Sequence, residues 1–108
     1  MPLAAAGPSA PQPSRDDRKR AEAEARKRAR AEDARRARIG ELETRIAETE
    51  QAVREVERAM SAPGFYDDRT AAQAMIDRHQ ALMWEVGDLM SRWEALQGAS
   101  DLAAAGDA

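Results

Sequence analysis

Two runs of residues with alternating spacings of three and four positions constrain the fold of this chain most strongly. The first run is Ile39, Leu42, Ile46, Thr49, Val53, Val56 and Met60, and the second is Ala72, Met75, His79, Leu82, Val86, Leu89, Trp93 and Leu96. This spacing aligns the side chains along one face of an α-helix, as the a and d positions of a coiled coil do. Each run therefore predicts a helix that packs against another helix.

The stretch S-A-P-G-F-Y-D-D-R at 61–69 separates the two runs and predicts a fold-back. Pro63 disfavours helix in the residue before it, and Gly64 follows directly, so the first helix should end there. A turn at 61–68 brings every a position of one run opposite a d position of the other. We therefore expect an all-α chain whose residues 39–97 form an antiparallel two-helix coiled-coil hairpin.

Residues 15–38 predict a long, basic N-terminal helical extension of the hairpin. Ser14 with Asp17 three residues later is a capping-box pattern, which favours a helix start. The segment contains no apolar side chain larger than Ala, and its helix is supported by i,i+4 pairs such as Glu22–Arg26. Gly40, just inside the seam, suggests a hinge between this helix and the hairpin.

Both ends of the chain predict disorder. Residues 1–14 are a Pro/Ala-rich linker with no side chains that could nucleate a core. Gly98 is a candidate helix stop, so residues 98–108 are expected to form a disordered tail.

Composition excludes several classes of function. There is no Cys, so disulfides and thiolate metal sites are excluded, and no metal or cofactor is expected. No apolar run approaches the roughly 20 residues of a membrane span, and the first residues do not resemble a signal peptide. We expect a cytoplasmic protein that does not bind membranes.

Two features of the sequence invite a catalytic interpretation, and in both a structural role is favoured. Asp67 and Asp68 could act as an acid/base pair or as metal ligands, but consecutive carboxylates at a helix start suit N-capping better. His79, the only histidine, falls in the seam and has neither a Cys nor a suitable Ser to activate. Phe65 and Tyr66 are expected to close the end of the seam.

Charge is distributed unevenly, and the basic half is the candidate nucleic-acid contact. Residues 15–38 contain 11 Lys and Arg against 6 Asp and Glu, whereas residues 39–108 contain 6 against 14. Basic side chains neutralise phosphates, although such runs are also common on solvated helices, and these surround the helix with acids between them. The candidate residues are Arg18, Lys19, Arg20, Arg26, Lys27, Arg28, Arg30, Arg35, Arg36 and Arg38.

A second apolar strip lies beside the second seam and is the candidate partner-docking surface. Its members are Ile76, Met83, Trp84, Gly87 and Met90. A stripe wider than a two-helix seam needs could dock a third element or mediate self-association, with Gly87 allowing close approach. Scattered surface apolar residues are the simpler alternative.

The sequence resembles the C-terminal coiled-coil domain of ABC-F ATPases, the Uup-type members in particular, over about residues 15–97. The resemblance rests on the basic helix and I-G-E-L-E-T-R-I-A-E-T-E, on the turn A-P-G-F-Y-D-D, and on R-W-E-A-L near the end. The turn is also similar to the helical N-terminal region of bacterial release factors.

The ABC-F resemblance implies a non-catalytic accessory module. It implies weak, non-specific contact with DNA, ribosomal RNA or the ribosome, and partnership with ABC-type ATPase domains. No G-x-x-x-x-G-K-[ST] or L-S-G-G motif occurs in the chain, so no phosphate cradle is predicted and we expect no enzyme activity. The alternative is a structural module that docks on a protein partner or on itself.

Overall fold

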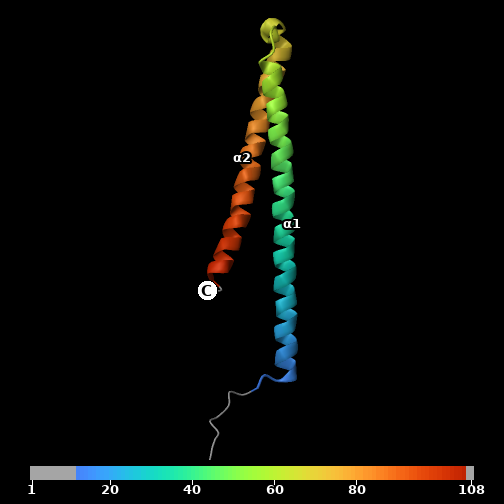
Figure 1. The fold of residues 1–108 in the computed structure, drawn as a ribbon, viewed down its shortest axis with the longest axis vertical. Coiled ribbons are helices and arrows are strands. Elements are labelled where there is room, and N and C mark those ends of the chain that lie inside the picture. Colours follow the sequence, from blue (N-terminus) through green and yellow to red (C-terminus); the bar gives the residue numbers. More distant parts are fainter. Residues whose placement is uncertain (1–11, 107–108) are drawn as a thin grey trace, which may run out of the picture. The chain divides into compact units, whose positions relative to one another are not determined.

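The computed structural model describes residues 12–106, with two helices and a short turn. The elements in chain order are α1 (Arg15–Met60), the 3₁₀ turn η1 (Phe65–Asp67) and α2 (Arg69–Gly106) (Figure 1). The chain divides into two compact units, Met1–Ala34 and Arg35–Ala108, each of which is considered by itself.

Helix α1 begins with the capping box that the sequence predicts. The Asp17 backbone N–H donates to the Ser14 hydroxyl oxygen at 3.0 Å, and the Ser14 N–H donates to Asp17 Oδ2 at 3.4 Å. The Arg18 N–H donates to the Ser14 carbonyl at 2.9 Å. Together these bonds satisfy backbone donors of the first turn, which have no partner inside the helix.

In the second unit, α2 runs antiparallel to the C-terminal part of α1 (Figure 1). All fifteen residues of the two predicted seams are buried or half-buried. Five of them are buried, namely Thr49, Val53, Val56, Ala72 and Leu89. The all-α antiparallel hairpin expected from the spacing is therefore confirmed.

Two interactions between the helices show how they are aligned. Arg45 donates to Glu85 Oε1 at 3.3 Å, and His79 Nε2 lies 3.4 Å from Glu57 Oε2. Thr49, the polar member of the first seam, donates its hydroxyl to the Arg45 carbonyl at 2.7 Å. This bond satisfies the hydroxyl within its own helix, so Thr49 can be buried without a partner on α2.

The connection between the helices depends on Gly64. This residue has φ 80° and ψ 5°, a left-handed conformation that is costly for any residue with a Cβ atom. The Phe65 N–H donates to the Ala62 carbonyl at 3.2 Å, and the Asp67 N–H donates to the Gly64 carbonyl at 3.0 Å. The chain thus reverses between Met60 and Arg69, where the sequence places the fold-back.

The expectation that both turn aromatics close the seam is half wrong. Phe65 is half-buried, but Tyr66 is 69% exposed. Their rings meet edge to face with centroids 4.8 Å apart. Consecutive residues of a 3₁₀ turn point about 120° apart, so only one of the two rings can face the hairpin.

The sequence suggests that Gly98 ends the second helix, and this prediction is wrong. Helix α2 continues to Gly106. Among the described residues only Gly64 has a positive φ, so Gly98 does not adopt the left-handed stop conformation. The following A-S-D-L-A-A-A favours helix strongly enough to offset one glycine. The tail predicted to be disordered is thus helical as far as Gly106.

The remaining ends of the chain lie outside the described residues. Residues 1–11 account for most of the predicted linker, and residues 107–108 complete the tail.

Helix α1 continues through Gly40 without a break. Within the described part of the chain, neither helix combines the length and the apolar character needed to cross a membrane.

The contrast between Gly64 and Gly40 gives a direct test of the turn. We expect Gly64→Ala to lower the free energy of unfolding by about 1–2 kcal/mol, because Ala must adopt the left-handed conformation there. A Cβ atom at Gly40 would meet nothing within 4 Å, so Gly40→Ala should raise that free energy by about 0.5–1 kcal/mol. Urea unfolding followed by circular dichroism measures both, and equal effects would contradict this account of the turn.

Candidate functional site

The two adjacent aspartates of the turn, Asp67 and Asp68, have structural roles. Asp68 Oδ1 accepts from the Ala71 N–H at 3.1 Å, and the Asp68 carbonyl accepts from the Ala72 N–H at 2.9 Å. Asp68 is therefore the N-cap of α2. Asp67 belongs to η1 and lies beside Gly64, where its Oδ2 would be 3.0 Å from a Cβ atom.

His79 lies at the edge of the core, as the heptad pattern predicts. Its side chain is 26% exposed, and its Nε2 atom is 3.4 Å from Glu57 Oε2, an ion-pair distance rather than a well-formed hydrogen bond. This position fits a polar residue that helps to set the alignment of the helices. Among the described residues, no group of three His, Asp or Glu side chains could hold a metal ion.

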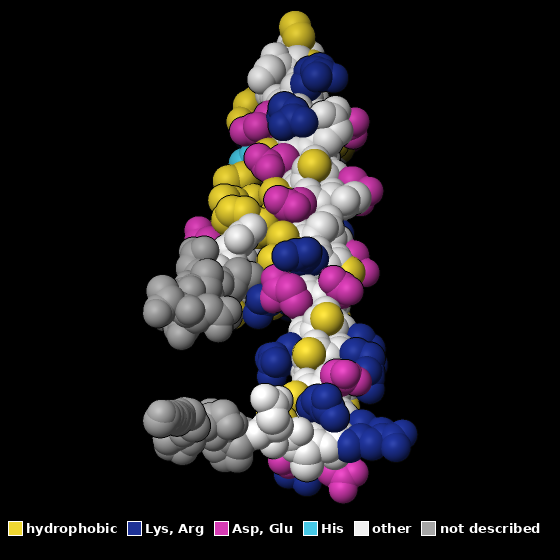
Figure 2. All heavy atoms as spheres, turned by 60° about the horizontal axis from the view of Figure 1, so that its bottom comes forward, with side chains coloured by type: hydrophobic (Ala, Val, Ile, Leu, Met, Phe, Trp, Pro, Cys, Tyr) yellow, Lys and Arg dark blue, Asp and Glu magenta, His cyan; other side chains and the backbone are white. Residues whose placement is uncertain are grey.

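All ten basic candidates for nucleic-acid contact belong to α1, but the two units share them. Nine are exposed and Arg35 is half-buried. Seven precede the unit boundary between Ala34 and Arg35, and three follow it. Figure 2 shows Lys and Arg side chains gathered over the N-terminal part of α1, with acidic side chains among them.

Five residues of the first unit form what we call the basic face: Lys19, Arg20, Arg26, Lys27 and Arg30. At about 100° per residue these positions fall within roughly 120° of the helix circumference. Among the acidic residues of α1 that belong to the first unit, only Asp16 falls in that sector. The others, such as Glu22 and Glu24, lie on other sides of the helix. The ten basic residues as a set do surround the helix, but half of them share one side.

A further group of arginines, which sequence reasoning missed in part, lies on the hairpin. Arg38 and Arg45 of α1 and Arg92 of α2 line one hollow whose remaining lining is Glu41, Leu42, Ala95 and Leu96. Arg45 pairs with Glu85 at 3.3 Å, and Arg92 pairs with Asp88 at 3.0 Å. Since two of its three arginines already have carboxylate partners, this hollow offers less to a phosphate than the basic face does.

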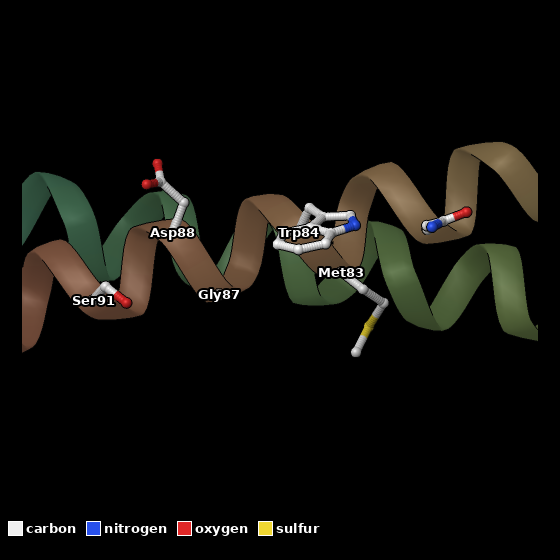
Figure 3. A pocket seen from close by; sticks show the side chains of 6 residues that line it. Met83, Trp84, Gly87, Asp88 and Ser91 are labelled. Atoms are coloured by element: carbon white, nitrogen blue, oxygen red, sulfur yellow. The ribbon is translucent and has the colours of Figure 1, made fainter.

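The predicted docking strip is exposed except at one end. Met83 is 50% exposed, Met90 43% and Trp84 74%, whereas Ile76 is half-buried. Met83, Trp84 and Gly87 line a shallow hollow with Gln80, Asp88 and Ser91. All six residues belong to α2, and the Trp84 ring lies along the outer surface of that helix (Figure 3).

The structure also places two α1 glutamates next to this strip, which sequence reasoning did not single out. Glu50 and Glu57 line a second hollow together with Met83 of α2. The heptad assignment contains the signal that could have found them, because Glu43, Glu50 and Glu57 occupy successive e positions of the first seam.

The described residues thus form an antiparallel helical hairpin with a capped turn, preceded along α1 by a segment rich in Lys and Arg. A family model for the ABC transporter C-terminal domain matches residues 30–98. This match spans well over half of the chain, and the protein belongs to that family. No curated protein and no solved structure matches the chain.

The matched range sharpens the resemblance seen in the sequence. It includes the whole hairpin seam and begins at Arg30, some fifteen residues later than the resemblance suggested. Four basic candidates, Arg30, Arg35, Arg36 and Arg38, lie inside the matched range, and the other six precede it. The family assignment therefore rests on the hairpin, and most of the basic face is additional to it.

The role of the two turn carboxylates can be tested by comparing them. We expect Asp68→Ala to lower the free energy of unfolding by about 1 kcal/mol, because the Ala71 N–H loses its acceptor. Asp67→Ala removes the same charge from an adjacent residue that does not cap α2, and should cost less than about 0.5 kcal/mol. Thermal unfolding of both variants measures the difference, and a larger loss for Asp67→Ala would contradict the capping assignment.

Proposed function

We propose that the protein is a non-catalytic accessory module of an ABC-type ATPase that contacts nucleic acid non-specifically. The contact is made by the basic face of α1 with the phosphate backbone. One observation carries this proposal: five exposed basic side chains share one side of α1 within the first unit. Family membership supports the accessory role, because the matching model describes a C-terminal domain rather than an ATPase domain.

The chemistry of the basic face favours phosphate over base recognition. Lys and Arg side chains on a helix surface neutralise phosphates and release counterions, which yields affinity without sequence preference. Residues 15–38 contain no aromatic side chain on which a base could stack. DNA and ribosomal RNA present the same phosphate chemistry, so both are suitable ligands for this face.

The acidic hairpin restricts where a nucleic acid can bind. Residues 39–108 contain 14 acidic and 6 basic side chains, and this excess repels a phosphate backbone. Two of the arginines that cluster on the hairpin, Arg45 and Arg92, are paired with Glu85 and Asp88 and are therefore partly neutralised. We therefore expect the nucleic acid to be held at α1, upstream of the hairpin.

The test measures binding to a duplex DNA and to a structured RNA by fluorescence anisotropy at several salt concentrations. If the basic face neutralises three or four phosphates, the logarithm of the association constant should fall with that of salt with a slope of about −3. Lys19→Gln, Arg26→Gln, Lys27→Gln and Arg30→Gln together should weaken binding to both nucleic acids at least about tenfold at 50 mM salt, and should flatten the slope.

The matched control removes the same charge from the hairpin. It combines Arg54→Gln, Arg58→Gln, Arg69→Gln and Arg78→Gln, all at exposed positions. This variant should retain most of the binding, because its arginines lie in the acidic unit. Equal weakening in the two variants would show that only total charge matters, and absence of binding by the unmodified protein at low salt would overturn the proposal.

A further inference from the structure

The two flanks of the hairpin seam differ in chemistry. On one flank Arg45 of α1 and Glu85 of α2 form an ion pair at 3.3 Å, as flanking positions of a coiled coil often do. On the other flank Glu50 and Glu57 of α1 line one hollow with Met83 of α2. These residues belong to two rows that each repeat every seven residues, Glu43, Glu50 and Glu57 on α1 and Ile76, Met83 and Met90 on α2. Carboxylates thus lie next to apolar side chains on that side. The apolar row offers the carboxylates no cation, and the carboxylates offer the apolar row no hydrophobic surface to pack on.

The lining of the hollow between the helices shows this mismatch directly. Val53, Val86 and Met83 form its apolar part, and Glu50 and Glu57 stand at its edge. Arg54 is the only basic residue in that lining, and it already donates to Gln51 Oε1 at 2.7 Å. Figure 2 shows a patch of hydrophobic side chains on the hairpin with acidic side chains beside it.

The apolar surface continues from this hollow onto the outer side of α2. There Trp84 and Gly87 adjoin Met83, and the side chains of Gln80, Asp88 and Ser91 complete the lining (Figure 3). A Cβ atom at Gly87 would meet nothing within 4 Å, so the hollow over this glycine is open to an incoming side chain. Methionines adapt their shape to a partner, and their exposure beside a Trp is typical of surfaces that bind helices.

The carboxylates that border the strip are mostly without partners. No ion pair or side-chain hydrogen bond within the described residues involves Glu43 or Glu50, and Glu94, on the same side of α2, has none either. Glu57 lies 3.4 Å from the imidazole of His79. The strip is therefore an apolar surface with an acidic border.

We propose that this strip docks a basic amphipathic helix of a partner protein. Apolar side chains of that helix, spaced by three and four residues, would pack on Met83, Met90 and the hollow at Gly87. Its Lys and Arg side chains would pair with Glu43 and Glu50. A helix suits the strip because Ile76, Met83 and Met90 recur with the heptad period.

Charge disfavours the other occupants. A symmetric dimer through this face would place the acidic border of one copy against that of the other, and like charges oppose such pairing. Nucleic acid is repelled by the same carboxylates. The chain's own basic segment at 15–38 has no apolar side chain larger than Ala to fill the hollow.

The test uses a synthetic probe peptide and the full chain. The peptide is about 21 residues long, with Leu at the a and d positions of three heptads and Lys and Ala elsewhere. A second peptide has the same composition with the Leu residues dispersed, and a third has Glu in place of Lys. Calorimetric titration should show binding of the first peptide at micromolar concentrations and at least about tenfold weaker binding of the other two. Trp84 emission should shift to shorter wavelength on binding.

Two pairs of charge variants locate the site. Glu43→Gln with Glu50→Gln should weaken binding of the basic peptide about three- to tenfold. Glu41→Gln with Glu48→Gln removes the same charge from exposed positions on another face of α1 and should leave the affinity unchanged. Met83→Ser with Met90→Ser should weaken binding at least about tenfold while the thermal unfolding curve changes little, since both side chains are about half exposed.

Several results would overturn the proposal. These are no binding of the basic amphipathic peptide, equal binding of the dispersed or acidic peptide, and equal losses in the two glutamate pairs. A further overturning result would come from sedimentation equilibrium. If the protein is a dimer and the double variant Met83→Ser with Met90→Ser is a monomer, the occupant of the strip is a second copy of the chain. Nucleic-acid binding by α1 is measured separately and should not weaken in any of these variants, so the two proposals fail independently.

Discussion

Packing of one apolar stripe against another is the interaction on which the hairpin depends. Each of its helices has a single neighbour, so only the a and d rows can be shielded from water. Leu89, only 1% exposed, is the best-shielded side chain of this seam, and residues outside the two rows are mostly exposed. Among the described residues, the side chains outside these two rows lie mostly on the outer faces of the helices. The chemistry of the hairpin is therefore arranged on these faces.

The two units carry opposite net charge, with an excess of basic residues in the first and of acidic residues in the second. Basic side chains on the first unit attract phosphate, and the carboxylates along the hairpin favour a cationic protein partner. Neither ligand suits the other surface. Under the two proposals, the nucleic acid and the basic partner helix bind to different units of the chain.

The sequence predicts the fold well because the signals that specify it are local and periodic. Alternating spacings of three and four identify every seam residue, and Pro63 with Gly64 locates the reversal. The capping oxygens of Ser14 and Asp68 follow from the same kind of local pattern. Spacing determines which side of a helix a residue occupies, and in a two-helix structure this almost determines burial.

The features that sequence reasoning missed depend on competing energies or on juxtaposition. Gly98 fails to stop α2 because the alanines that follow it favour helix, and no single residue reveals that balance. Tyr66 is exposed because a 3₁₀ turn admits only one ring to the seam. The sequence predicts the docking strip, but its acidic border comes from the other helix. The heptad pattern contains only an indirect signal for that border, and the structure shows it directly by placing Met83 with Glu50 and Glu57.

The left-handed residue at Gly64 also has a consequence for how the hairpin assembles. The seam residues nearest to the turn, Met60 and Ala72, are close in sequence, and seam residues farther from the turn close longer loops. Loop closure costs more entropy as the loop lengthens, so pairing should start beside the turn and proceed layer by layer toward Ile39 and Leu96. The position of Gly64, where the chain reverses, therefore determines the order in which the seam closes.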